Sequence, residues 1–162
     1  MTTGQEHQAV LTEISTRLLA RGWMLATAES CTGGLIAGAC TDLAGSSQWL
    51  ERGFVTYSNA AKAEMLGVPM GLIEQHGAVS EPVARAMAEG AVARSHAQVA
   101  LAVTGVAGPT GGTPTKPVGT VWFGWQVAGH THSEVQHFAG DRAAVRAQTV
   151  QHALARLLAL LG

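Results

Sequence analysis

The stretch 27–34, Thr-Ala-Glu-Ser-Cys-Thr-Gly-Gly, holds two side chains that can act as nucleophiles. The hydroxyl of Ser30 and the thiol of Cys31 can each attack a carbonyl carbon once a base removes the proton. The stretch follows a short apolar run, 23–26, and precedes a run of small residues, 35–40, that is typical of a helix. In α/β sheets, ligands bind beyond the carboxyl ends of the strands, where helix starts offer free N–H groups. The sequence therefore predicts a ligand site at this turn.

Few residues are placed to act as the base for Ser30. The seven histidines fall in terminal helices, near helix ends or in a late hairpin, so we expect none of them beside the turn. Lys62, one of two lysines, lies just after Tyr57, the only tyrosine, in the first turns of an expected helix. Loops that follow neighbouring parallel strands meet at one sheet edge, so Ser30, Tyr57 and Lys62 can converge. Burial and a helix N-terminus both disfavour the ammonium form, so Lys62 can be neutral and act as the base, with Tyr57 relaying a proton or orienting it.

Simpler interpretations compete with catalysis on residue types alone. A lysine and a tyrosine at the positions of Lys62 and Tyr57 are more often a solvated side chain and a half-buried core residue. Cys31, near a helix start, can have a lowered pKa and be the nucleophile itself. A cysteine in such a place is more often a small buried hydrophobe, which is the interpretation we favour.

Two other segments could contact a ligand. The segment 104–112 follows the most strand-like run of the chain; its glycines permit close backbone approach to a ligand, and Thr104 can hydrogen-bond one. It matches neither the phosphate-binding loop of nucleotide hydrolases nor the dinucleotide fingerprint, so a structural turn fits it equally well. Asp141 is expected to cap the last helix, and Arg142 in its first turn suits a phosphate, although a capped, solvated helix end is the commoner outcome. His130 and His132 share a strand face but lack a third ligand, so no metal site is predicted.

Helical and strand-like segments alternate along the chain. Hydrophobic periodicity and turn residues predict helices at 5–21, 33–42, 60–66, 72–77, 80–96 and 140–161, and strands at 23–28, 52–57, 99–103, 118–127 and 131–138. This order predicts an α/β fold. We expect a three-layer α/β/α domain with a mixed, mainly parallel sheet and a C-terminal β-hairpin followed by a helix. Because no linker or internal repeat is evident, residues 1–162 are expected to form one domain.

Composition narrows the function classes. Hydrophobic residues make up 47% of the 162 residues and charged residues only 13%, which excludes a disordered chain. The net charge of -1 gives no basic surface for nucleic acid or an anionic membrane. Two cysteines, the lack of a signal-peptide pattern and the lack of a bilayer-length apolar run predict a cytoplasmic protein. Low charge with abundant alanine and glycine fits either a buried subunit interface or a composition bias.

Five motifs, in this order along the chain, resemble one known family. They are Thr27–Gly34 (TAESCTGG), Gly53–Asn59 (GFVTYSN), His76–Ser80 (HGAVS), Gly105–Pro109 (GVAGP) and Lys116–Val121 (KPVGTV). Together they are similar to the CinA C-terminal-domain family, in its stand-alone form of nicotinamide-nucleotide amidases of the PncC type. The resemblance runs from about residue 6 to residue 160.

The resemblance implies an amidohydrolase that converts nicotinamide mononucleotide (NMN) and water to nicotinate mononucleotide and ammonia in pyridine nucleotide recycling, with no cofactor. It implies Ser30 as nucleophile, Lys62 as base and Tyr57 as an assisting residue. The implied substrate-binding residues are Glu29, Thr32, Gly33, Ser46, Ser47, Thr104, Gly105, Gly108 and Arg142. Within this set, Ser46 and Ser47 are expected near the scissile amide, and Arg142 near the phosphate.

The resemblance also implies that the protein assembles with copies of itself, and it reveals one departure from the family pattern. We expect a homo-oligomer, either a dimer or a trimer. Thr110 stands where the family pattern has an acidic residue or glycine, which bears on substrate preference. The alternative function from another class is a catalytically silent, CinA-like module that binds a nucleotide or a partner protein.

Overall fold

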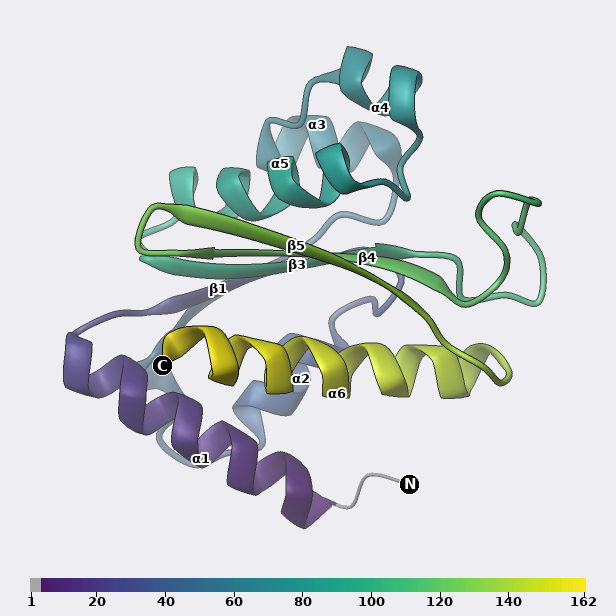
Figure 1. Ribbon diagram of the computed structural model, residues 1–162. Helices are drawn as coiled ribbons and strands as arrows, with labels where there is room; N and C mark the ends of the chain where they lie inside the picture. The colour runs from purple at the N-terminus through teal and green to yellow at the C-terminus, as the bar shows by residue number, and fades with distance from the viewer. Residues whose placement is uncertain (1–3) are drawn as a thin grey trace.

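The protein is a sheet held between two layers of helices (Figure 1). The computed structural model describes residues 4–162, with side chains from residue 7 onward. The helices are α1 (Gly4–Arg21), α2 (Leu35–Thr41), the 3-10 helix η1 (Ser46–Gln48), α3 (Asn59–Leu66), α4 (Met70–His76), α5 (Glu81–Ala93) and α6 (Arg142–Leu161). The strands are β1 (Leu25–Glu29), β2 (Leu50–Val55), β3 (Val99–Gly105), β4 (Thr120–Val127) and β5 (His130–His137). The predicted α/β architecture is confirmed, including the C-terminal hairpin and the long helix after it.

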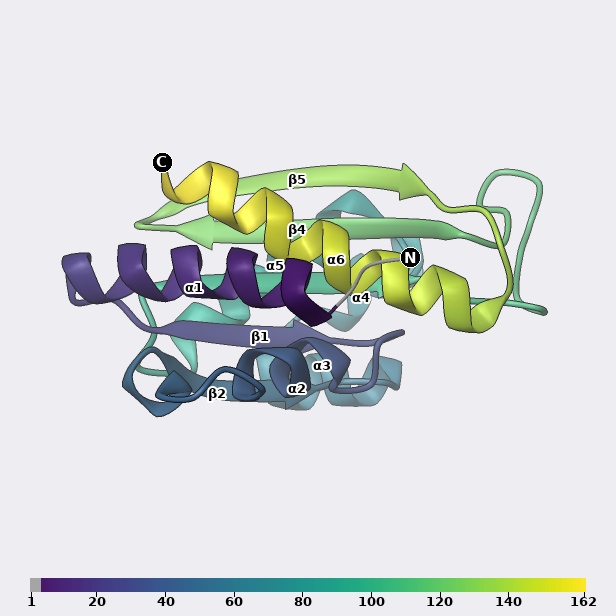
Figure 2. The ribbon, with the colours of Figure 1, turned by 90° about the horizontal axis from the view of Figure 1, so that it is seen from below.

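The two faces of the sheet are covered by different helices. Helices α3, α4 and α5 lie on one face, and α1, α2 and α6 lie on the other (Figures 1 and 2). Side chains of β3 alternate between these layers, because successive residues of a strand point to opposite faces. Val99, Leu101 and Val103 pack in the core on the side of α1 and α6, whereas Ala100 and Ala102 pack with α5. The strand is therefore buried on both faces, as its unbroken apolar run predicts.

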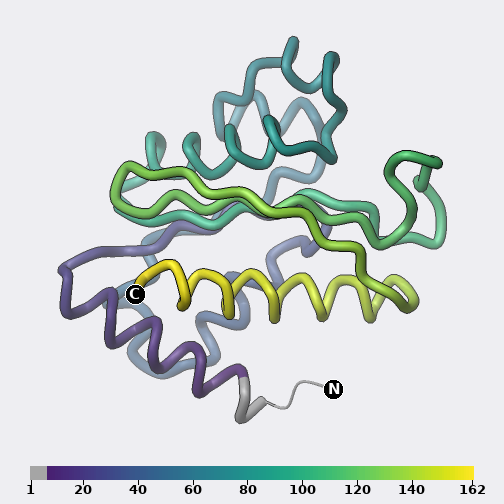
Figure 3. Tube along the Cα trace, in the orientation of Figure 1, coloured from purple at the N-terminus to yellow at the C-terminus, as the bar shows by residue number. Residues whose placement is uncertain are grey.

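The strand order is β2-β1-β3-β4-β5, which places β1 between two parallel neighbours. Glu29, the last residue of β1, lies opposite Val55 of β2 and Val103 of β3. The residues that follow these three strands therefore meet at one edge of the sheet. The loop 106–119 projects beyond the same edge in the Cα trace (Figure 3). This edge is where the candidate residues gather.

Local backbone chemistry fixes the ends of the helices near this edge. The helix predicted from residue 33 begins only at Leu35, because Gly33 and Gly34 have left-handed φ values of 60° and 109°. Such values interrupt a right-handed helix and are adopted readily only by glycine. The hydroxyl of Ser58 caps α3 by accepting the N–H of Ala61 at 3.0 Å. Asp141 caps α6 in the same way, as predicted.

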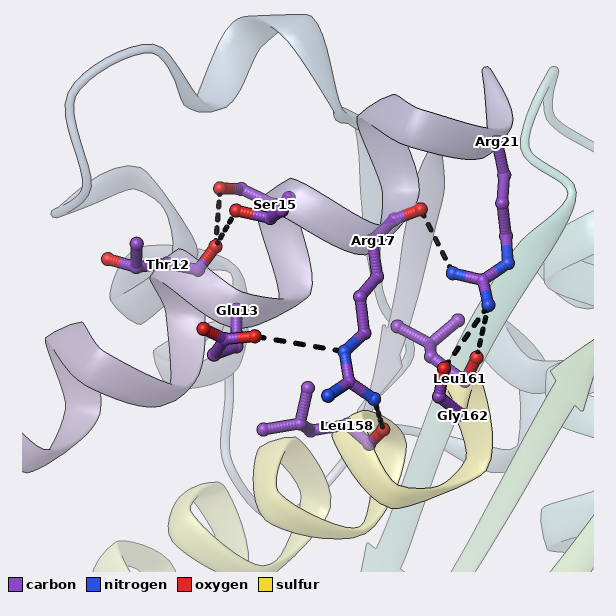
Figure 4. Close-up of polar contacts among 9 residues, drawn as sticks. Thr12, Glu13, Ser15, Arg17, Arg21, Leu158, Leu161 and Gly162 are labelled. Carbon is purple, nitrogen blue, oxygen red and sulfur yellow. Dashed lines mark hydrogen bonds and ion pairs between the residues drawn. The ribbon is translucent and has the colours of Figure 1, made fainter.

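The helices at the two ends of the chain are joined to each other at the end of α6. Arg17 and Arg21 of α1 donate hydrogen bonds to the carbonyls of Leu158, Leu161 and Gly162 (Figure 4). These carbonyls lie in the last turn of a helix, where they have no partner within the helix. The contact thus satisfies the C-terminal end of α6 and fixes this helix against α1. Over the described part of the chain, none of the helices combines the length and apolarity needed to cross a lipid bilayer.

Candidate active site

Ser30 sits in a tight turn between β1 and α2, which we call the Ser30 turn (residues 30–34). The N–H of Ser30 donates to the carbonyl of Val103 at 3.1 Å, which extends the pairing of β1 with β3 by one residue. The carbonyl of Ser30 accepts the N–H of Gly33 at 3.1 Å, which closes the turn. The backbone of Ser30 is thus held on both sides, and its side chain is free to point along the sheet edge.

The side chain of Lys62 reaches Ser30 from helix α3. Its ammonium nitrogen Nζ lies 3.1 Å from Ser30 Oγ, and it donates to the carbonyls of Thr56 at 3.0 Å and Tyr57 at 3.3 Å. Lys62 is almost fully buried, at 1% exposure. None of the ion pairs within residues 7–162 involves it. The predicted convergence of Ser30 and Lys62 is therefore confirmed, and the solvated lysine of the simpler interpretation is not found.

This environment favours the neutral amine of Lys62. Burial lowers the pKa of Lys62 below its ordinary value of 10.5, while the neighbouring Cys31 acts in the opposite direction. A buried ammonium without a carboxylate partner is costly, so the group loses its proton more easily. A neutral amine has two N–H donors and one lone pair. The two carbonyls can take the two donors, which leaves the lone pair directed at the hydroxyl of Ser30.

Cys31, the rival nucleophile, has the opposite character. Its side chain is 6% exposed, and burial raises the pKa of its thiol to about 11. Since the thiolate and not the thiol attacks carbonyl groups, this shift works against Cys31 as the nucleophile. Cys31 packs in the hydrophobic core on the α1, α2 and α6 side, and it forms no disulfide. The structure thus supports the interpretation of a small buried hydrophobe.

A cavity of about 360 Å³ opens beside Ser30 and Lys62. It is lined by Ser30, Cys31, Tyr57, Asn59, Lys62, Ala78, Val79, Thr104, Gly105, Val106, Ala107, Gly108, Thr110, Gly111 and Arg142. The lining includes the guanidinium of Arg142 and no carboxylate, which suits an anionic ligand, whereas a neutral Lys62 adds no positive charge. The predicted contacts Thr104, Gly105 and Gly108 all lie on this wall.

The glycines of this wall permit a close approach of backbone. A Cβ atom on Gly108 would lie 2.4 Å from the side chain of Val118, and one on Gly105 would lie 2.7 Å from Val121. The hydroxyl of Thr104 donates to the carbonyl of Ala78 at 2.9 Å, which ties the end of β3 to the loop after α4. The wall is therefore a packed structure of defined shape.

Arg142 and Tyr57 stand at the rim of this cavity. Arg142 donates from Nη1 to the carbonyl of Gly108 at 2.9 Å, and its Nη2 lies 3.5 Å from the hydroxyl of Tyr57. The tyrosine is 63% exposed, so the half-buried core position expected for it is wrong. The hydroxyl of Tyr57 contacts Arg142 and not Lys62, whereas the main-chain carbonyl of Tyr57 holds Lys62. Any orienting of the lysine by Tyr57 therefore acts through the main chain.

Glu29 and Thr32 do not line this cavity, and their role as substrate contacts stays a prediction. The carboxylate of Glu29 accepts the hydroxyl of Thr32 at 2.5 Å and the N–H groups of Ile36 at 2.8 Å and Ala37 at 3.0 Å. Both side chains are buried. These contacts provide hydrogen-bond acceptors at the N-terminus of α2, where the N–H groups lack partners within the helix and a negative charge is favourable. Gly33 also lies outside the cavity lining, beside the guanidinium of Arg146.

We expect Glu29→Gln to lower the free energy of unfolding by about 2 kcal/mol, since a carboxamide replaces one acceptor oxygen with a donor that faces a buried N–H or hydroxyl. Chemical denaturation of the purified variant measures this loss. The matched control is Glu74→Gln on α4, whose exposed side chain makes no hydrogen bond or ion pair with residues 7–162. Equal stability of the two variants would contradict this role for Glu29.

Ser46 and Ser47 lie near the amino-terminal ends of β1 and β2, away from Ser30 in the same chain, and their role near the scissile amide stays a prediction. They form η1, just before the start of β2. The carbonyl of Trp49, two residues after Ser47, accepts the N–H of Leu25 at the beginning of β1. Five residues of extended chain separate Leu25 from Ser30, or about 16 Å. Helix α2 carries the chain back across the sheet between these points.

Several residues at the site lie outside the set of site residues predicted from the sequence. Asn59 and Ala78 line the cavity, and Arg146 of α6 donates to the carbonyls of Cys31 and Thr32 at 3.0 and 3.2 Å. Asn59 and Ala78 belong to motifs quoted for the family resemblance, which was the available signal. For Arg146 the only signal was its place one helical turn after Arg142.

Comparison with known proteins gives a consistent picture. The family model of the CinA C-terminal domain matches residues 7–161. The chain is 56% identical over 143 residues to the nicotinamide-nucleotide amidohydrolase PncC of Enterobacter agglomerans, covering 88% of this chain and 87% of that protein. It is 51% identical over 156 residues to the protein of the same name from Escherichia coli K12, covering 96% and 94%. The crystal structure of the competence/damage inducible protein CihA from Agrobacterium tumefaciens superposes with a TM-score of 0.93 at 46% identity, covering 96% of both chains. The chain belongs to the CinA C-terminal domain family.

Proposed function

We propose that this protein is a nicotinamide-nucleotide amidohydrolase that converts NMN and water to nicotinate mononucleotide and ammonia. Relatives that carry this name match nearly the whole chain at more than 50% identity. The observation that carries the chemistry is the buried Lys62 Nζ at 3.1 Å from Ser30 Oγ, where no carboxylate of residues 7–162 pairs with the lysine to hold it charged. A serine beside a neutral lysine is an activated nucleophile for acyl transfer.

The reaction begins when Ser30 Oγ attacks the carboxamide carbon of NMN while Lys62 takes the hydroxyl proton. Negative charge develops on the carboxamide oxygen, and amide N–H groups of the Ser30 turn stabilise it. Lys62 then gives its proton to the departing nitrogen, and ammonia leaves an acyl-enzyme ester on Ser30. Water attacks this ester with Lys62 again as base, which releases nicotinate mononucleotide and restores Ser30.

The remaining residues of the cavity fit recognition of the nucleotide. Arg142 at the rim offers a guanidinium to the phosphate, because a planar fork of N–H donors matches phosphate oxygens. The cavity wall from Thr104 to Gly108 can contact the rest of the nucleotide through backbone groups. The exposed Tyr57 also lines the cavity, with its hydroxyl beside Arg142.

The proposal is tested by ammonia release from NMN by the purified protein, with nicotinate mononucleotide identified as the second product. We expect stoichiometric formation of the two products. Saturable NMN binding without any ammonia release would overturn the amidase and favour a silent nucleotide-binding module.

Arg142→Met is expected to lower kcat/KM for NMN by about 30-fold, mainly through KM, since loss of a charge-assisted hydrogen bond to phosphate costs about 2 kcal/mol. The dephosphorylated substrate, nicotinamide riboside, should be affected less than about 3-fold, because it has no phosphate to lose. Arg52→Met, at an exposed arginine on β2 paired with Glu51, serves as the control. An equal loss for both substrates would mean that Arg142 does not bind the phosphate.

A further inference from the structure

The guanidinium of Arg146 in α6 binds two main-chain carbonyls of the Ser30 turn. Its Nε donates to the carbonyl of Cys31 at 3.0 Å and its Nη2 to the carbonyl of Thr32 at 3.2 Å, across more than a hundred residues of chain. The side chain is half-buried, and no ion pair within residues 7–162 includes it. A guanidinium that donates hydrogen bonds to two consecutive carbonyls fixes the orientation of two peptide units.

Those two carbonyls belong to the two residues that follow Ser30 directly. The carbonyl of Thr32 also accepts the N–H of Leu35, but the carbonyl of Cys31 has Arg146 as its one partner within residues 4–162. Gly33 and Gly34 come next, both with left-handed φ. Because glycine rotates easily between conformations, this backbone needs an external contact to keep one geometry.

The same turn holds two N–H groups next to the nucleophile that have no acceptor in another described residue, and that of Cys31 also acts on the Cys31 thiol, whose pKa it lowers. Within residues 4–162, no carbonyl and no side chain of another residue accepts the N–H of Cys31 or of Thr32. A peptide unit is planar and trans, so its N–H and C=O point in opposite directions. With the carbonyl of Cys31 drawn to Arg146, the N–H of Thr32 points away from α6. The N–H of Cys31 points away from the Ser30 carbonyl, which faces Gly33.

Cys31 lines the cavity together with Ser30 and Lys62, so its main chain belongs to the part of the turn beside the nucleophile. In hydrolases whose nucleophile lies on a strand-to-helix turn, the N–H of the residue after the nucleophile is one oxyanion donor. The positive charge of Arg146 also favours negative charge at the Ser30 turn. Burial raises the pKa of the Cys31 thiol, whereas the charge of Arg146 lowers it. The charge of Arg146 therefore stabilises an anion at this turn.

We propose that Arg146 is a positioning residue for amide hydrolysis: by holding the carbonyls of Cys31 and Thr32 it fixes the two peptide units that follow Cys31, and so keeps the Ser30 turn in the one geometry in which the Cys31 N–H serves as an oxyanion donor while Ser30 Oγ stays within reach of Lys62. This inference rests on the proposed function. It assigns the last helix a part in turnover that is separate from the rim contact of Arg142.

The test compares Arg146→Met and Arg146→Lys with Arg156→Met, a change on the same helix at an exposed arginine paired with Glu134. We expect Arg146→Met to lower kcat for NMN about 100-fold, the effect of losing or misplacing an oxyanion donor, with KM changed less than about 3-fold. The midpoint of the acidic limb of the pH profile should not move, because Lys62 is untouched. Arg146→Lys should recover to within about 10-fold of wild type, since an ammonium can hold one carbonyl. Arg156→Met should match wild type.

A second readout separates this proposal from the proposed function. Labelling of Ser30 by a fluorophosphonate, followed by mass spectrometry, reports nucleophile and oxyanion geometry without NMN turnover. If wild type releases no ammonia, the amidase is wrong, yet slower labelling in Arg146→Met than in Arg156→Met still supports the positioning role. Wild-type kcat or wild-type labelling in Arg146→Met overturns it, as does a loss in KM alone. If Arg146→Met does not fold, Arg146→Lys decides: a kcat reduced at least about 5-fold at an unchanged thermal midpoint supports the proposal, and a wild-type kcat overturns it.

Discussion

Ser30→Ala is expected to abolish the release of ammonia from NMN, lowering kcat by about 10⁴-fold or more. Alanine removes the only atom that forms the acyl-enzyme, while the backbone of the turn keeps its bonds to Val103 and Gly33. Ammonia production by wild type and variant at saturating NMN gives the ratio. Denaturation of both proteins shows that the variant is folded.

A matched change elsewhere makes this result specific. Ser15→Ala replaces a serine of α1 whose hydroxyl bonds only within its own helix, so wild-type turnover is expected. Trapping is a second check, because an acyl-enzyme on wild type should be seen by mass spectrometry at residue 30 after rapid acid quench. Wild-type turnover by folded Ser30→Ala would refute serine catalysis and return attention to Cys31.

Lys62→Met is the second change with a large expected effect, a fall in kcat of about 10³-fold or more. Methionine fills a similar volume but cannot accept the proton of Ser30. Lys62→Arg should be equally inactive, although it keeps a positive charge, because a guanidinium does not lose its proton in this pH range. Lys116→Met, at the only other lysine, is the control and should retain activity within about 3-fold. An active Lys62→Arg protein would contradict a lysine base.

The pH dependence of wild type carries the signature of the same group. Because burial lowers the pKa of Lys62, kcat/KM should rise with pH along an acidic limb whose midpoint lies below 10.5. Below that midpoint Lys62 holds its proton and cannot act as base. A limb with its midpoint at the ordinary lysine value would show that the site does not tune this group.

The pH dependence of the free energy of unfolding reports the pKa of Lys62 without any measurement of turnover. Below the lowered pKa, Lys62 is protonated in both folded and unfolded chains, and the buried charge costs the folded state free energy. Between the lowered pKa and 10.5, the folded state has released its proton while the unfolded state still binds it, so the stability of wild type rises with pH. Relative to Lys62→Met, the free energy of unfolding of wild type should therefore increase across this window. A pH-independent difference would mean that the pKa of Lys62 is not lowered.

The sequence by itself predicted two helical layers around a mixed sheet and the convergence of Ser30 and Lys62, and the family resemblance assigned these two residues their roles. A buried apolar run such as 99–103 and an amphipathic last helix are local signals, and two parallel strands followed by Ser30 and by Lys62 must bring those residues to one edge. The pair Gly33-Gly34 is also typical of a turn, although the sequence placed the start of the helix at residue 33 and the structure begins it at Leu35. These features depend on residues that are near one another in the chain or on the direction of neighbouring strands.

Only the tertiary structure decided which way the side chains around this edge are turned and what they contact. Glu29 lies next to Ser30, yet its carboxylate points back to helix α2, because the free N–H groups there are the nearest donors in the buried layer. Ser46 and Ser47 lie away from Ser30 in the same chain, because a helix of seven residues, about 10 Å long, first returns the chain to the amino-terminal ends of β1 and β2. Arg146 is 115 positions from Cys31. No local pattern encodes a contact of that span, because it exists only once α6 packs against the layer that carries the Ser30 turn.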